Sequence, residues 1–319
     1  MGSASPLAVE SVAISDVDAM TAAMADGVVS EYVQLDAKPF TGHWAIARFS
    51  KLTVQFGRAD IAVVRRIRVP AEKWAFMVPL AVPESRWNGR GVDGDELIVC
   101  PPRAECYAFD AGGTRFAILS VPERGSLARC ARHLIGRDEG PCTLRPRAHN
   151  ARELRDQLCA MATAAEVDRP ISKSAGPVIA GTLVASLEGA VVERRTVALP
   201  ERSQIVHRAE EFFRCHVGEP VSMARLSSVA GVSERSLRNA FYDVCTTSPK
   251  RYLKLWQLHQ VRRALRAAER GVATVTNVAT FHGFFELGRF AGEYKALFGE
   301  SPSETLSQAR IRNSPRPGF

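Results

Sequence analysis

Two stretches in the last third of the chain carry polar side chains at the spacing of one helix face. Arg235, Arg238 and Asn239 stand in the first stretch, and Glu286 and Arg289 in the second. Side chains three or four positions apart are neighbours on a helix surface. Arginine can donate two hydrogen bonds to guanine, asparagine can pair with adenine, and glutamate can accept from cytosine, all at base edges in the major groove. We therefore predict contacts from these five residues to the bases of duplex DNA.

The first polar stretch falls on the second of two short predicted helices joined by a tight turn. Gly231 supplies the positive φ that such a turn requires. Ser222 and Ser233 stand where a side-chain oxygen can cap the helix that follows each of them. Five apolar residues have the spacing needed to pack where the two helices cross: Leu226, Val229, Ala230, Leu237 and Phe241. The pattern predicts a helix-turn-helix unit.

The same plan recurs further along the chain, which indicates an internal duplication. Gly283 follows Gly231 by 52 positions. Ser301-Pro302 follows Ser248-Pro249 by 53 positions and closes its unit in the same way. A second helix-turn-helix unit is therefore predicted.

The outward helix of the second unit has less side-chain chemistry than that of the first. Phe290 and Tyr294 are predicted to point inward, and Gly288 and Gly292 replace side chains on this helix. Fewer base contacts, close approach of the backbone to DNA, or simple close packing would each explain the glycines.

A longer helix is predicted between the two units. Ser248 is the expected N-cap and Pro249 the first helical residue, where the missing N–H costs nothing. If this helix holds the units about 34 Å apart, both outward helices can enter successive major grooves. Its predicted buried stripe is Leu258, Val261, Leu265 and Ala268, with Gly271 at its end.

Contacts to phosphate position a protein on DNA without recognising sequence. A phosphate contact, or an ordinary surface charge, is the alternative interpretation of each arginine named above. The residues that we predict to contact the DNA backbone are Ser222, Lys250, Arg251 and Lys295.

One run of residues is more specific than a general helix-turn-helix pattern: Gly283-Phe284, Leu287-Gly288-Arg289-Phe290, Tyr294-Lys295 and Phe298-Gly299-Glu300-Ser301-Pro302. It resembles the C-terminal signature of the AraC/XylS family of bacterial transcription regulators, and the similarity covers about Ser203 to Leu306. The resemblance implies promoter or operator DNA and RNA polymerase as partners, a homodimer, and a small-molecule effector bound by an N-terminal cupin-like domain. The sequence departs from the family pattern at Asn239, where family members commonly carry a basic residue. This difference weakens the case for a base contact at Asn239.

The basic charge of the chain belongs to its last third. Of 319 residues, 42 are Lys or Arg and 34 are Asp or Glu, a formal net charge of +8. From Glu201 onward there are 18 basic and 11 acidic residues, which leaves the first 200 residues close to neutral. This asymmetry fits a nucleic-acid-binding module joined to a domain of another kind.

No stretch of the sequence predicts a membrane span or a secretory signal. No run of eighteen apolar residues occurs, and no basic segment followed by an apolar one opens the chain. The seven cysteines are scattered, without a Cys-x-x-Cys pair. We therefore expect a cytoplasmic protein whose cysteines are reduced thiols.

Short β-like runs between Trp44 and Pro122 predict a small barrel or sandwich. In one run Leu52, Val54 and Phe56 alternate with polar neighbours, and glycine and proline turns separate the runs. Three helices are predicted to follow, at Glu123–Ile135, Ala151–Ala165 and Pro177–Arg194, and one of them is a candidate dimer interface. The predicted fold class is α+β, with a cupin-like small β-barrel and a C-terminal all-α domain.

The barrel offers candidate effector residues of aromatic and polar type, as small-molecule sites usually do. Plain core packing is the alternative for each of them. Arg65, Arg66 and Arg68 place cations along one strand, which could face an anionic effector or simply solvent. No His-x-His cluster is present, so neither a metal nor another cofactor is expected. The candidate pocket residues are Trp44, Arg48, Trp74, Phe76, Trp87 and Tyr107.

These patterns predict four segments: an effector-binding and dimerisation domain at 1–195, a linker at 196–202, a DNA-binding domain at 203–306 and a disordered tail at 307–319. The predicted function is an effector-responsive transcriptional regulator, more specifically an activator. One alternative is a regulator whose N-terminal domain only dimerises. The other is a barrel enzyme with a DNA-binding tail, for which no catalytic residue is apparent: Cys142 follows a proline, but no adjacent histidine lowers the pKa of its thiol.

Overall fold

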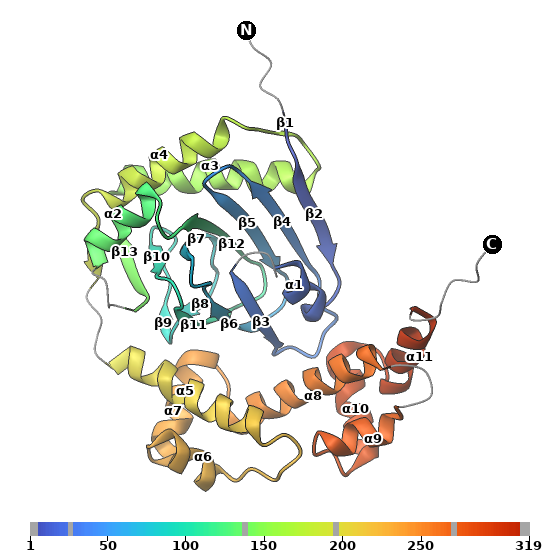
Figure 1. The fold of residues 1–319 in the computed structure, drawn as a ribbon. Coiled ribbons are helices and arrows are strands. Elements are labelled where there is room, and N and C mark those ends of the chain that lie inside the picture. The colour runs from blue at the N-terminus through green and yellow to red at the C-terminus, as the bar shows by residue number, and fades with distance from the viewer. Residues whose placement is uncertain (1–5, 25–27, 136–139, 194–197, 269–272, 313–319) are drawn as a thin grey trace, which may run out of the picture. The chain divides into compact units, whose positions relative to one another are not determined.

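The computed structural model describes residues 6–24, 28–135, 140–193, 198–268 and 273–312 (Figure 1). The chain forms two compact units. The β unit contains Met1–Tyr32 and Phe40–Pro200, and the helical unit contains Val33–Pro39 and Glu201–Phe319. Among the described helices, none has the length and apolar character needed to cross a membrane.

The β unit is built on an antiparallel sheet of eight strands. The long central strands β7 and β12 pair over most of their length, from Trp74 opposite Val121 to Phe116 opposite Pro79. In spatial order the strands are β15 (Val191–Glu193), β13 (Cys142–Arg145), β10 (Leu97–Cys100), β7 (Lys73–Ala81), β12 (Thr114–Pro122), β5 (Thr53–Ala59), β4 (Gly42–Arg48) and β2 (Val9–Ile14).

A second sheet and several helices cover this large sheet. The second sheet has the order β3 (Val29–Gln34), β6 (Val63–Arg68), β11 (Glu105–Asp110), β8 (Ser85–Trp87) and β9 (Arg90–Gly91). A small ladder pairs β1 (Pro6–Leu7) with β14 (Ile171–Ser172). The helices are α1 (Val17–Ala23), α2 (Ser126–Ile135), α3 (Ala148–Glu166) and α4 (Ala175–Leu187), and Figure 1 shows α3 and α4 lying across the large sheet.

Alternation along the central strands creates two separate cores. On β12, Ala117 and Leu119 face the helices and join the side chains of α2, α3 and α4. The intervening Phe116 and Ile118 face the second sheet and α1. Successive strand residues point to opposite faces, so the large sheet must be covered on both sides.

The predicted fold class is confirmed, with one difference in the β unit. No ladder joins the two larger sheets among the described strands, so the cupin-like barrel is open. The helix predicted over Pro177–Arg194 is wrong beyond Leu187, because β15 follows and pairs with β13. The strands β2 and β3 lie before the region from Trp44 to Pro122 in which strands were predicted.

The helical unit contains seven helices in the described part of the chain. The predicted linker at 196–202 overlaps the first of these helices, which begins at Ala198. Pro200 is compatible with this helix because it stands in the first turn, where its missing N–H is tolerated. The prediction of a disordered tail at 307–319 is wrong up to Arg312, because a helix continues to that residue. Residues 313–319 lie outside the described part of the chain. The helices are α5 (Ala198–Cys215), α6 (Met223–Ala230), α7 (Glu234–Cys245), α8 (Pro249–Ala267), α9 (Val275–Phe281), α10 (Leu287–Phe298) and α11 (Pro302–Arg312).

The predicted caps of α6, α7 and α8 and the predicted glycine turns of both helix-turn-helix units are confirmed. The Oγ atoms of Ser222, Ser233 and Ser248 accept hydrogen bonds from backbone N–H groups three residues later. Gly231 and Gly283 have φ values of 71° and 87°, the left-handed conformation that glycine adopts without strain. These local interactions place α7 and α10 as the second helices of the two units.

Packing in the helical unit agrees with most of the predicted contacts. The stripe Leu258, Val261, Leu265 and Ala268 on α8 is buried, whereas Gly271 lies outside the described residues. Leu226, Ala230, Leu237 and Phe241 are also buried. Val229 is 42% exposed, so the contact predicted for it where the two helices cross is wrong.

The helical unit also includes Val33–Pro39, a segment from the N-terminal half of the chain. The backbone N–H of Gln34 donates to Nε2 of His259 on α8 at 3.1 Å. The side-chain amide of Gln34, which is buried, donates to the carbonyl oxygen of Leu297 on α10 at 2.9 Å. Arg251 on α8 donates to the carbonyl oxygen of Leu35 at 3.2 Å. The segment therefore satisfies polar groups of two helices and is an integral part of this unit.

Candidate functional site

Helix α7 presents a polar face to solvent. Arg235, Arg238 and Asn239 are all exposed, and Leu237 and Phe241 on the other side of the helix are fully buried. Arg238 donates to the carboxylate of Glu234 at 2.9 Å. In the part of the chain that the structure describes, Arg235 and Asn239 make no side-chain hydrogen bond or ion pair. Their donors and acceptors are therefore available to a partner outside the protein.

Tyr242 extends this face, although the sequence analysis did not identify it. Its side chain is 54% exposed, and it lies one turn beyond Arg238 and Asn239 on α7. A phenol can donate a hydrogen bond to a phosphate oxygen. The i, i+4 spacing from Arg238 was the available signal, but an aromatic residue in a helix is more commonly part of a core.

Helix α10 has a different surface. Phe290 and Tyr294 are buried as predicted, and the hydroxyl of Tyr294 lies 2.9 Å from Oγ1 of Thr305. Burial raises the pKa of Tyr294 well above its usual value. The outward-facing Arg289 is held by Glu286 at 3.6 Å and by Glu293 at 3.1 Å. The two predicted base-contacting residues of this helix, Glu286 and Arg289, therefore neutralise one another in the free protein.

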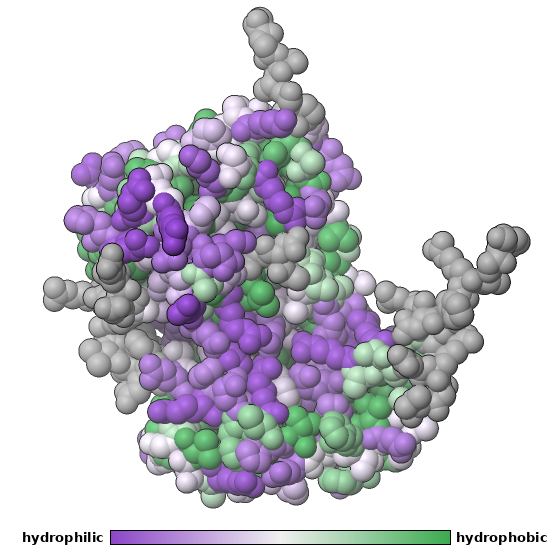
Figure 2. Space-filling view, viewed as in Figure 1, coloured by the Kyte–Doolittle hydropathy of each residue, from purple (hydrophilic) through white to green (hydrophobic). Residues whose placement is uncertain are grey.

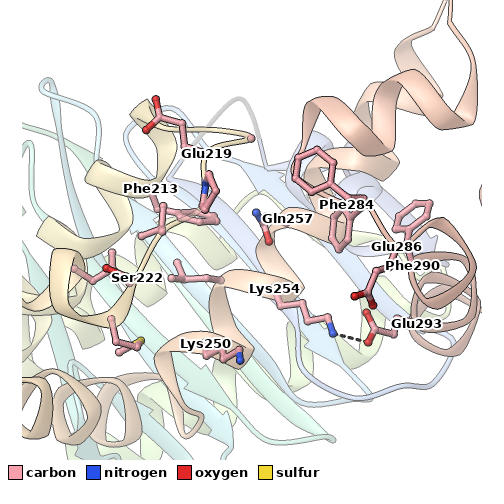
Figure 3. A pocket seen from close by; sticks show the side chains of 18 of the residues that line it. Phe213, Glu219, Ser222, Lys250, Lys254, Gln257, Phe284, Glu286, Phe290 and Glu293 are labelled. Atoms are coloured by element: carbon pink, nitrogen blue, oxygen red, sulfur yellow. Dashed lines mark hydrogen bonds and ion pairs between the residues drawn. The ribbon is translucent and has the colours of Figure 1, made fainter.

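A cleft of about 680 Å³ lies within the helical unit, between the start of α6, the side of α8 and the start of α10 (Figure 3). Lys250 and Lys254 of α8 point into it, and Lys254 forms an ion pair with Glu293 of α10. Burial alone would raise the pKa of Glu293, but hydrogen bonds from Lys254 and Arg289 lower it below the usual value. The cleft is also lined by apolar side chains, Phe213, Met223, Phe284, Phe285 and Phe290, and by polar ones, Glu219, Ser222, Gln257, Glu286 and Arg289.

The four predicted phosphate contacts do not share one site. Ser222 and Lys250 line the cleft, and Ser222 also caps α6. Lys295 is exposed on α10. Arg251 is exposed too, but its guanidinium donates to the carbonyl oxygen of Leu35 and so has a structural role in the helical unit.

The six predicted pocket residues are not gathered round one cavity. Trp74 and Phe76 face the helices in the first core, whereas Trp44 and Trp87 lie in the second core. Arg48 is on the surface, paired with Glu10 at 2.5 Å, and Tyr107 is buried. A prediction based on residue type could not separate the two faces of the large sheet. Trp87 is the one member of this set that lines a small cavity between the two larger sheets.

A small cavity of about 20 Å³ lies between the two larger sheets, and it has room for about one water molecule. Arg65 on β6 lines it, forms a buried ion pair with Asp110 and stacks 3.9 Å from the centre of the Phe116 ring. Nη1 of Arg65 has no hydrogen-bond partner among the described residues. Arg65 and Arg66 are 2% and 4% exposed, so their predicted solvated strand face is wrong.

No group of three or more metal-ligating side chains occurs in the described ranges. The cysteines form no disulfide bond among the described residues. Sγ of Cys100 and Sγ of Cys106 lie 3.7 Å apart in the interior of the β unit.

Comparisons with known proteins match the helical unit. A helix-turn-helix domain family model matches residues 226–308. The probable thc operon regulatory protein of Rhodococcus erythropolis is 38% identical over 113 residues, which are 35% of this chain and 34% of that protein. XylDLEGF operon transcriptional activator 2 of Pseudomonas putida is 33% identical over 42% of this chain and 84% of that protein.

A solved structure is also similar to this part of the chain. It is a probable AraC family transcriptional regulator from Rhodopseudomonas palustris, with 34% identity, a TM-score of 0.31, and coverage of 34% of this chain and 99% of that one. The aligned region spans about a third of the thc operon regulatory protein. The 33% identity of this chain to XylDLEGF operon transcriptional activator 2 over 84% of that protein, together with the tandem helix-turn-helix units, establishes that the chain belongs to the AraC/XylS family of bacterial transcriptional regulators.

Proposed function

We propose that this protein is a sequence-specific transcriptional regulator that binds promoter or operator DNA through α7 and α10. The observation that carries this proposal is the exposed face of α7, where Arg235 and Asn239 have no partner among the described residues. Arginine and asparagine at the start of a recognition helix are the side chains that best distinguish guanine and adenine. The basic charge of the last third of the chain supplies the general attraction to DNA.

The sign of regulation is proposed from the relatives. The matched proteins of Pseudomonas putida are described as activators of the XylDLEGF operon. We infer activation here as well, by a cytoplasmic homodimer that contacts RNA polymerase once it is bound at a promoter. A dimer would place several helix-turn-helix units on one DNA segment and so increase affinity through simultaneous contacts.

The β unit is proposed to bind a small-molecule effector between its two sheets. Two features support this site: the cavity beside Trp87 and the unpartnered Nη1 of Arg65, which could donate to an acceptor on the effector. The cavity has room for about one water molecule, so a larger effector requires the sheets to separate. Binding can regulate only if the effector has different affinities for the DNA-competent and DNA-incompetent states.

The proposed function is tested by selecting duplexes from a random pool with the full-length chain. The selected duplex is then compared with a scrambled duplex of the same composition at two salt concentrations. A specific regulator should retain a preference for the selected duplex as salt rises, since base contacts are less salt-dependent than phosphate contacts. Recovery of no preferred sequence, or equal loss of binding to both duplexes, would contradict the proposal.

A further inference from the structure

The two recognition helices can be compared residue by residue, because their buried positions coincide. Leu237 and Phe241 of α7 correspond to Phe290 and Tyr294 of α10, each pair being 53 positions apart and at most 2% exposed. The same shift relates Ser248-Pro249 to Ser301-Pro302. In this register Gly288 and Gly292 occupy the positions of Arg235 and Asn239. The two polar residues without a partner on α7 therefore have no side-chain counterpart on α10.

Nothing in the described chain requires glycine at these two positions. A Cβ added to Gly288 or Gly292 would meet no atom within 4 Å, and neither residue has a positive φ. Close packing within the protein is therefore not the explanation. Glycine weakens a helix relative to alanine, so the bare surface carries a cost in the free protein.

The charged groups of α10 do not replace the missing side chains. Arg289 is held between Glu286 and Glu293, and Glu293 also binds Lys254. A guanidinium held by two carboxylates has to give up these partners before it can bind guanine. Arg289 on α10 is thus already paired, whereas Arg235 and Asn239 on α7 have no partner among the described residues.

Apolar side chains project at the start of α10 instead. Phe285 is 67% exposed immediately before the N-cap residue Glu286, and Leu287 is 37% exposed at the first helical position. Figure 2 shows apolar side chains exposed among polar ones on the surface of the helical unit. Phe285 also lines the cleft into which Lys250 points. The N-terminal residues of a recognition helix are those that contact base edges in the major groove.

We propose that α10 recognises its half of the DNA site through the methyl groups of thymine, with Phe285 and Leu287 as the contacting side chains. The C5 methyl of thymine is the apolar group that the base pairs present in the major groove. The bare surface at Gly288 and Gly292 lets the helix backbone approach the bases closely enough for these contacts. The lysines of the cleft complement the negative charge of the adjacent phosphates. This inference rests on the proposed function.

The test uses the full-length chain and the duplex that it selects from a random pool. Thymines are replaced one at a time by deoxyuridine, which removes only the methyl group, and affinity is measured for each duplex. The half-site bound by α10 is the one whose recognition does not change in Arg235→Ala. In that half-site, loss of each contacted methyl group should reduce the affinity about fourfold. At the thymine that Phe285 contacts, Phe285→Ser should bind the thymine and deoxyuridine duplexes equally, whereas Phe285→Leu, which keeps an apolar side chain, should still distinguish them.

Val229→Ser is the matched control, because it exchanges another exposed apolar residue of the helical unit for serine outside the cleft. It should distinguish thymine from deoxyuridine as the unmodified chain does. The inference is overturned if the selected half-site has no recurrent thymine, if deoxyuridine has no effect there, or if Phe285→Ser keeps the full discrimination. Failure of the proposed function gives a different result, since the unmodified chain would then select no preferred duplex at all.

Discussion

The backbone N–H of Gln34 donates a hydrogen bond to Nε2 of His259, so that a residue early in the chain completes the helical unit. The side-chain amide of Gln34 satisfies the carbonyl oxygen of Leu297 in the same unit. DNA-binding assays are consequently best made on the full-length chain, because a fragment that begins at Arg202 lacks this segment.

Gln34→Ala should destabilise the helical unit. The substitution leaves the carbonyl of Leu297 without its buried donor, which costs about 1–3 kcal/mol. Hydrogen exchange of backbone amides in α8 and α10 measures the loss as faster exchange. Lys38→Ala is the control, since Lys38 is exposed and contributes only its carbonyl oxygen to the Gln34 network. Equal exchange in the two variants would show that the segment does not stabilise these helices.

Arg235→Ala and Lys250→Ala should weaken DNA binding in different ways. Without Arg235, discrimination at one base pair of the selected duplex should fall by about 1–3 kcal/mol. Without Lys250, affinity should fall alike for all sequences, and the slope of log K against log salt should become shallower by about 0.9. Binding titrations on selected and scrambled duplexes at several salt concentrations separate the two effects. A uniform loss in Arg235→Ala would assign that side chain to phosphate instead.

Gly288→Ala and Gly292→Ala should stabilise the protein and weaken its binding to the selected duplex. Each replacement should add about 0.5–1 kcal/mol to the free energy of unfolding, because alanine favours the helix and has room for its methyl group. The added methyl should also hinder close approach of DNA to α10. Gly181→Ala in α4 is the matched control, because its Cβ also meets open space. Unchanged DNA affinity in the α10 variants, alongside higher stability, would exclude backbone approach at these positions.

Glu293→Gln should strengthen DNA binding, since it releases Lys254 and Arg289 from a shared carboxylate. Affinity for duplex DNA should rise and depend more steeply on salt. Glu304→Gln on α11 changes the net charge by the same amount without releasing these two residues. Comparable gains in both variants would indicate a general charge effect.

The same substitution should reduce stability only above acidic pH. The folded-state pKa of Glu293 lies below its ordinary value of 4.5, so the ionised carboxylate stabilises the folded protein above that value. This contribution, about 0.2–1 kcal/mol for such an exposed network, is lost as the pH falls through the lower folded pKa. Urea unfolding of the unmodified chain and of Glu293→Gln should therefore differ at pH 7 and converge in acid. A constant difference at all pH values would point to a cause other than the charge.

Local interactions explain which features could be predicted from the sequence. The caps Ser222, Ser233 and Ser248 bond to N–H groups three residues away, and Gly231 and Gly283 adopt the turn conformation through their own backbone. Such short-range constraints, repeated after about fifty residues, specify the tandem helix-turn-helix units and the inward faces of α7 and α10. The same reasoning identified Arg235 and Asn239 as outward residues.

Partners distant in the sequence decided the rest. Periodicity placed Arg289 on the outside of α10, but only the folded unit brings Lys254 to Glu293 and leaves the charges of α10 satisfied. Residue type selected six pocket residues, yet alternation along β4 and β7 places Trp44 in one core and Trp74 and Phe76 in the other, on opposite faces of one sheet. The sequence by itself thus determined the two DNA-binding units and their exposed faces. The tertiary structure decided which charges are free, where the cavity lies, and that Gln34 belongs with α8 and α10, because these depend on contacts between residues far apart along the chain.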